Sequence, residues 1–99
     1  MPRSLDADRE LANAREAMAA GAFDRARDAA WRAASAAAQI GDEGALEEVV
    51  AIASTLAEND VGEADQLRIY AQASLEDARE GTRPPSMFER LLGRDRRRR

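Results

Sequence analysis

Residues 23–41 read FDRARDAAWRAASAAAQIG, and they carry the clearest structural signal in the chain. With successive side chains placed about 100° apart, as in an α-helix, one side is apolar and the other is polar. The apolar side holds Phe23, Ala26, Ala30, Ala33, Ala34 and Ala37, and the polar side holds Asp24, Arg25, Asp28, Arg32, Ser35 and Gln39. Because the apolar arc is wide, we expect other helices to contact this helix on two sides, and we expect Gly41 to end it.

Helical periodicity continues on both sides of this stretch. Before it, an apolar stripe predicts a helix that Gly21 ends and for which Ser4 and Asp6 are alternative N-caps. Its members are Ala7, Leu11, Ala14 and Met18. After Gly41, we expect Asp42 to cap a third helix. The stripe predicted to be buried in that helix is Leu46, Val49, Val50, Ala53, Leu56 and Ala57.

A fourth helix is expected after the break at Asn59-Asp60, because Asp60 and Glu63 have the spacing of a capping box. Its predicted apolar stripe is Ala64, Leu67, Ala71, Ser74, Leu75 and Ala78. Gly81 and then Pro84-Pro85 prevent the helix from continuing. The sequence therefore predicts an all-α fold of four helices.

The chain also resembles itself at an offset of 38 residues, which predicts two antiparallel helical hairpins, about 5–42 and 43–80. At this offset Leu11 falls on Val49, Met18 on Leu56, Ala26 on Ala64 and Ala33 on Ala71. The offset is longer than the 34 residues typical of tetratricopeptide repeats.

The turn Gly21-Ala22-Phe23-Asp24-Arg25-Ala26, followed by Ala33, resembles the turn of a tetratricopeptide repeat. The large residues of that family's first helix are missing, since Glu10, Asn13 and Ala17 stand at their positions. The resemblance implies a protein-binding surface between the first helices of the two hairpins. Asn13 and Arg15 are near the expected place. A generic four-helix bundle remains the alternative.

The composition favours a binding role over catalysis. The chain has no His, Cys or Lys, so imidazole bases, thiol nucleophiles, Schiff bases and most transition-metal sites are excluded. We therefore expect no enzyme activity, no cofactor and no metal. Its 15 cationic residues are all Arg and 23 residues are Ala, which is typical of GC-rich bacterial genomes. Without an apolar signal segment, the expected location is the cytoplasm.

Charge divides the chain into a domain at 1–82 and a basic amphipathic tail at 83–99. The first part has 8 Arg against 17 acidic residues, a net charge of −9, and the second has 7 Arg against 2, a net charge of +5. No basic residue occurs between positions 33 and 67, which indicates an acidic surface, a solvated helix exterior or a surface for the Arg tail.

The tail begins with the Pro-Pro break and contains a second capping-box pattern, which predicts a short helix. Its candidate contact residues are Phe88, Leu91, Leu92, Arg96, Arg97, Arg98 and Arg99. The alternatives are a solubilising end, an anionic membrane surface and nucleic acid. We do not expect nucleic-acid binding, because the first part would repel phosphates and no aromatic residues lie between the arginines.

Three further residues bear on the expected partner, which is another protein or a second copy of this chain. Trp31 lies at the rim of the apolar arc, where it either anchors a partner or packs against the neighbouring hairpin. Ile69 falls on the polar side of the fourth helix, as an isolated exposed residue or as a dimer contact. Tyr70 is expected in the core. These features predict a self-associating interaction module.

Overall fold

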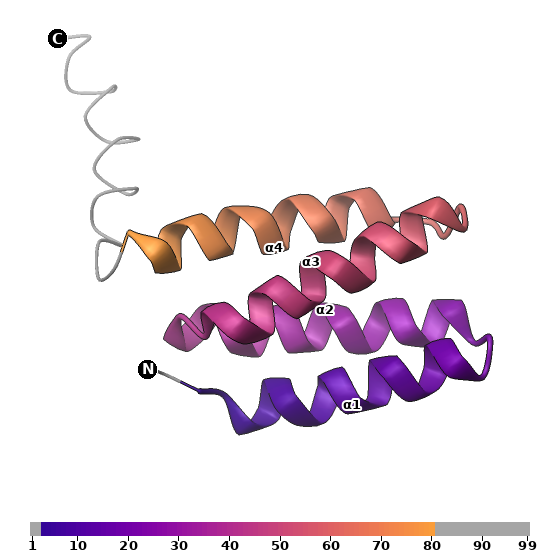
Figure 1. Cartoon of the computed structure of the whole chain (residues 1–99), viewed down its shortest axis with the longest axis horizontal. Helices are drawn as coiled ribbons and strands as arrows, with labels where there is room; N and C mark the ends of the chain where they lie inside the picture. Colours follow the sequence, from indigo (N-terminus) through magenta and orange to yellow (C-terminus); the bar gives the residue numbers. More distant parts are fainter. Residues whose placement is uncertain (1–2, 81–99) are drawn as a thin grey trace, which may run out of the picture.

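The computed structural model of this protein describes residues 3–80, which form four α-helices (Figure 1). The helices are α1 (Leu5–Ala19), α2 (Phe23–Ile40), α3 (Glu43–Glu58) and α4 (Ala64–Arg79). The prediction of an all-α fold with two helical hairpins is confirmed over these residues. The predicted tail helix lies outside them.

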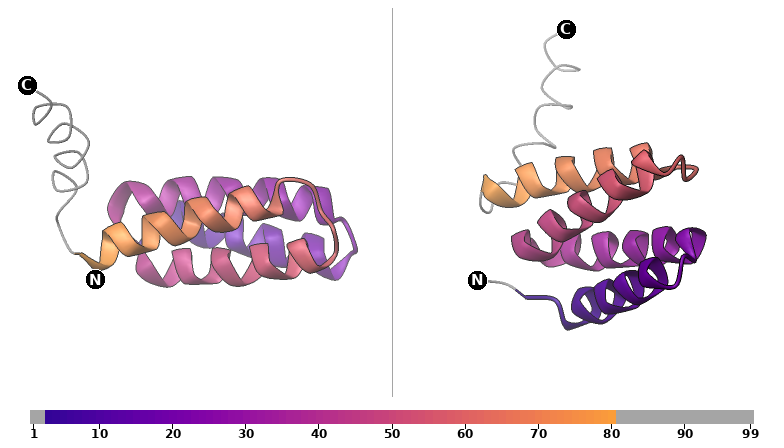
Figure 2. Two further views of the ribbon diagram at one scale, coloured as in Figure 1. Left: turned by 90° about the horizontal axis from the view of Figure 1, so that it is seen from above. Right: turned by 45° about the vertical axis from the view of Figure 1, so that its right-hand side comes forward.

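The two hairpins, α1–α2 and α3–α4, lie one on the other (Figure 2, right). Helix α2 contacts α1, α3 and α4, which explains the wide apolar arc of its sequence. Helices α1 and α3 also touch, so a surface shared by the two hairpins runs along them. The start of α1 and the end of α4 lie at the same end of the molecule (Figure 1).

Glycines end the two helices of the first hairpin, as predicted. Gly21 and Gly41 both have left-handed backbone conformations, with φ of 77° and 73°. In each case the following N–H donates to a carbonyl five residues back, because the left-handed residue turns the chain over the helix end. The bonds run from Ala22 to Ala17 at 2.8 Å and from Asp42 to Ala37 at 3.0 Å.

Asp60 has a different role from the predicted one. It does not cap α4; it stands in the left-handed position that ends α3, with φ of 60°. The N–H of Val61 then donates to the carbonyl of Leu56 at 3.0 Å, as after Gly21. Helix α4 begins only at Ala64, and its N-cap residue Glu63 makes no side-chain capping bond. The capping-box prediction was wrong because Asp60 closes the preceding helix and Glu63, not Asp60, is the residue before α4.

Alanine dominates the buried core. Each hairpin contributes ten buried apolar residues. The largest fully buried side chains are Leu11, Leu46, Val49, Leu56 and Leu67. Small side chains let helix backbones approach closely, so the core is thin and tightly packed. Val50 and Ala57, which were predicted to be buried, lie half-buried at the edge of α3.

Candidate interaction surfaces

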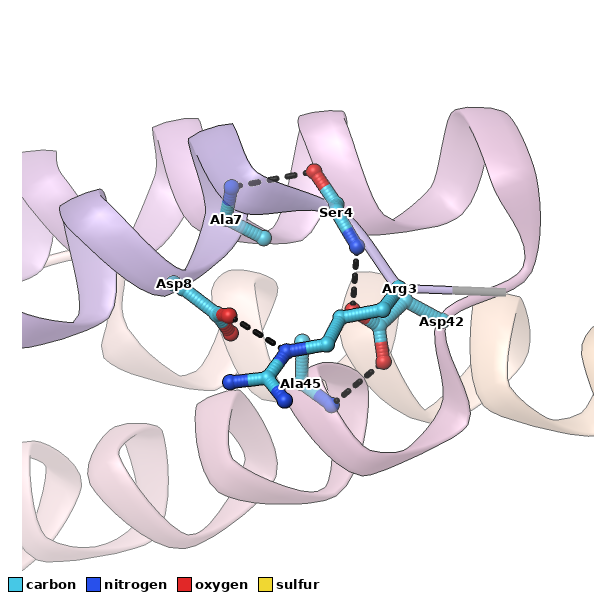
Figure 3. A network of polar contacts seen from close by, with 6 residues as sticks. All are labelled: Arg3, Ser4, Ala7, Asp8, Asp42 and Ala45. Carbon is cyan, nitrogen blue, oxygen red and sulfur yellow. Dashed lines mark hydrogen bonds and ion pairs between the residues drawn. The ribbon is translucent and has the colours of Figure 1, made fainter. Parts of the chain in front are cut away.

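A buried carboxylate joins the two hairpins at the starts of α1 and α3 (Figure 3). Asp42, which is 6% exposed, caps α3 as predicted by accepting a hydrogen bond from the N–H of Ala45 at 3.2 Å. Its second oxygen accepts from the N–H of Ser4 at 2.8 Å. Ser4 is itself the N-cap of α1, because its Oγ accepts from the N–H of Ala7 at 3.0 Å. One carboxylate therefore fixes the register between the hairpins.

A cleft of about 380 Å³ opens beside this junction, on the surface shared by α1 and α3. Its lining carries both signs of charge, from Arg3, Asp8, Glu43 and Glu48. Asp8 accepts a hydrogen bond from Nε of Arg3 at 2.7 Å, and this bond raises the pKa of Arg3 above its ordinary value. The guanidinium is fully exposed, so this ion pair contributes to the distribution of charge on the surface and little to stability.

Arg15 faces this same α1–α3 surface. Its guanidinium pairs with Glu48 of α3, and both side chains are 53% exposed. Such an exposed pair contributes about 1 kcal/mol or less to stability, so either partner can be drawn toward another charged group at little cost. Of the two polar residues predicted on the first helix, Arg15 therefore lies between the first helices of the hairpins.

Asn13 lies on a different surface. It lines a second cleft, of about 250 Å³, between α1 and α2, together with Glu16, Ala17, Ala20, Arg25, Ala29 and Arg32. Its amide donates a long hydrogen bond of 3.4 Å to Glu10. Two positions along a helix correspond to a rotation of about 200°, so Asn13 and Arg15 cannot serve one surface.

The acidic run of the sequence is largely neutralised in its first half. Arg79 of α4 bonds Glu47 at 2.8 Å and lies 3.9 Å from Glu43, while Arg15 engages Glu48 from α1. Among residues 3–80, eight acidic side chains have no ion-pair partner. Three of them belong to this run and lie at the end of α3 and in the loop after it: Glu58, Asp60 and Glu63.

Trp31 packs against the neighbouring hairpin. Its ring lies against Tyr70 of α4, with centroids 5.5 Å apart and planes tilted by 38°. The prediction that Tyr70 is a core residue was wrong: it is 36% exposed, because it covers the edge of the tryptophan instead of entering the alanine seam. A partner-binding role for Trp31 stays a prediction.

Ile69 is 59% exposed, which confirms its place on the outer side of α4. The other exposed large apolar residues in the described chain, besides Tyr70, are Leu5 and Ile40. The candidate contacts of the tail lie outside the described residues: Phe88, Leu91, Leu92 and Arg96, Arg97, Arg98 and Arg99.

Polar pairing is complete inside residues 3–80, where every buried side-chain nitrogen and oxygen has a hydrogen-bond partner. In this same range no three acidic side chains converge on a point where a metal ion could sit. None of its helices combines the length and the apolar character needed to cross a bilayer. No protein-family model matches the chain, and no curated protein or solved structure is significantly similar to it.

Proposed function

We propose that this protein is a non-catalytic protein–protein interaction or assembly module that also associates with itself. The observation that carries the proposal is the α1–α3 surface, where both hairpins present charged side chains around one cleft. The resemblance to tetratricopeptide repeats supports the same surface, because such repeats bind partners between their first helices. The absence of His, Cys and Lys from the sequence supports a role without catalysis.

The chemistry of the α1–α3 surface favours a partner segment with charged side chains. Arg15 and Glu48 are half exposed, and within the described part of the chain each forms an ion pair with the other alone. A partner with an acid and a base at matching spacing can therefore replace their mutual contact. The side chains of Arg3 and Asp8 extend the same pattern toward the start of α1. Charge complementarity of this kind selects a partner and its orientation more than it adds affinity.

The proposal is tested with charge reversal on this surface. Immobilised protein is compared with Arg15→Glu, with Glu48→Arg and with the double variant, and retained proteins are identified by mass spectrometry. The double variant restores the ion pair but inverts its direction, so it separates lost folding from lost recognition. Partners that all three variants lose, and that Arg68→Glu retains, support the proposal. Partners retained by the double variant would contradict it.

Self-association is tested on the outer side of α4. We expect the mass of the full chain from light scattering to exceed that of a monomer at micromolar concentration, and Ile69→Arg to lower it. Exposed apolar side chains rimmed by polar ones favour contacts between copies. A monomeric full chain at these concentrations would refute the self-associating part of the proposal and leave the α1–α3 surface untouched.

The tail supplies the rival function, attachment to an anionic membrane through residues 86–99. A chain that ends at Pro85 decides between the two. Partners bound equally by both lengths support the α1–α3 surface. Binding to vesicles containing phosphatidylserine by the full chain alone, with loss at high salt, would support the rival.

A further inference from the structure

Arg25 stands apart from the other arginines of the described chain. Eight arginines lie within residues 3–80, and seven of them form an ion pair with an acidic side chain in that range. Arg25 forms none, although these residues hold 17 acidic side chains against 8 basic ones. An unpaired guanidinium in so acidic a protein is an available site for an anionic group.

Local geometry leaves Arg25 without an ion-pair partner among residues 3–80. Asp28 is three residues further along α2, a spacing at which it could pair with Arg25. Its Oδ1 instead accepts bonds from Nε and Nη2 of Arg27, at 3.2 and 3.1 Å. Arg25 is also the third residue of α2, where the positive end of the helix dipole disfavours a cation. Neither helix pairing nor the helix dipole therefore accounts for an arginine at this position.

The surroundings of Arg25 form a small recognition site. It lines the cleft of about 250 Å³ between α1 and α2, with Asn13 and Arg32 as further hydrogen-bond donors. The floor includes Ala17 and Ala29, which are 3% and 1% exposed. Nε of Arg32 lies 3.1 Å from the carboxylate of Glu10, so one arginine–carboxylate ion pair already stands beside the cleft.

We infer that this cleft binds the carboxylate of an acidic side chain on a partner protein. Arg25 donates to the carboxylate, the Asn13 amide adds a neutral donor, and the alanine floor receives the aliphatic part of the partner's side chain. The inference adds a second surface to the proposed interaction role, on a side of α1 that Arg15 does not share.

The net charge of the surrounding protein favours a carboxylate over a phosphate in this cleft. Glu16 lines the cleft and Glu10 lies beside it, bonded to Arg32. These two acids balance the charges of Arg25 and Arg32, so the preference comes from the net charge of −9 over residues 1–82. Its repulsion grows with the charge of the ligand, and a phosphate group carries nearly twice the charge of a carboxylate.

Nuclear magnetic resonance titration of the full ¹⁵N-labelled chain tests the inference. The probes are the peptide acetyl-Ala-Leu-Glu-Ala-Leu-amide, its version with Gln in place of Glu, and its version with phosphoserine. We expect saturable shifts at the amides of Ala17, Ala20 and Ala29 with the Glu peptide, and at least tenfold weaker binding of the Gln peptide. Arg25→Gln should remove these shifts, whereas Arg68→Gln, which loses a surface pair with Asp65 instead, should retain them.

Three outcomes would overturn the inference: no saturable shift, equal affinity for the Glu and Gln peptides, or unchanged binding by Arg25→Gln. Tighter binding of the phosphoserine peptide would assign the cleft to phosphate and also overturn it. Failure of the α1–α3 proposal is distinguishable, because Arg15→Glu should leave the peptide shifts in place. Unchanged spectra of Arg25→Gln away from the cleft show that the variant remains folded.

Discussion

Nine of the ten buried apolar residues of the first hairpin are alanines, with Leu11 as the exception. In the second hairpin only four of ten are alanines, and the others are Leu, Val or Ile. The turns within the two hairpins also differ, since the left-handed residue after α1 is the small Gly21 and the one after α3 is the larger Asp60. The same topology is thus built once from close helix contact and favourable helix propensity, and once from larger apolar side chains.

The largest effect is expected where the second hairpin depends on volume. Leu56 is fully buried, and Leu56→Ala should lower the free energy of unfolding by about 3 kcal/mol, because it removes apolar contacts and leaves a cavity. Urea denaturation followed by circular dichroism measures the change. A loss below about 1 kcal/mol would mean that this hairpin also closes around small side chains.

In the first hairpin we expect a small-to-large substitution to lower the stability. Ala33 has no exposed surface, and Ala33→Leu should destabilise the protein by about 2 kcal/mol because the tight seam has no room for three more carbons. The control is Ala12→Leu, at an exposed position of α1, for which we expect a change within about 0.5 kcal/mol. Equal effects of the two changes would remove the distinction between the cores.

A substitution at the junction between the hairpins should lower the free energy of unfolding by less. Asp42→Ala deletes the cap of α3 and leaves the N–H of Ser4 without its acceptor, so we expect a loss of about 1.5 kcal/mol. The fluorescence of Trp31, the single tryptophan, reports on the packing between hairpins. If its urea transition separates from that of circular dichroism, the hairpins have become independent units.

The smallest effect should be a gain. Asp60 adopts the left-handed conformation that glycine adopts without strain, so Asp60→Gly should stabilise the protein by about 0.5 kcal/mol. Gly21→Ala removes a glycine from the corresponding position in the first hairpin. It should destabilise the protein, because the backbone there is also left-handed. Thermal unfolding of both variants measures the two shifts. A loss of stability in Asp60→Gly would show that the carboxylate itself supports the turn.

Sequence periodicity predicted the number of helices and most of their ends, because capping residues act locally. Asp42 and Gly41 could be identified, and Ser4 proposed as one of two N-caps beside Asp6, without knowing which helices pack together. It did not predict the role of Asp60, since one residue cannot both end α3 and start α4, and the spacing to Glu63 fits only the second use.

The surfaces could be predicted only in part. In α1, alanines occur on several sides of the helix, so periodicity does not show which side faces α2 and which faces α3. The resemblance to tetratricopeptide repeats placed Asn13 and Arg15 near one binding surface, whereas they lie on separate surfaces. The signal that Arg25 is unpaired appears only when the competing bond from Arg27 to Asp28 is known, which requires side-chain geometry.

Because the Ser4 N–H donates to Asp42, hydrogen exchange at this one backbone amide reports on separation of the two hairpins. The N–H of a residue just before a helix ordinarily exchanges with solvent as soon as the chain end frays. Here exchange requires the first residues of one hairpin to leave the carboxylate of the other. A protection factor lower than that of amides inside α2 means that the hairpins separate before they unfold. Equal protection factors mean that they unfold as one cooperative unit.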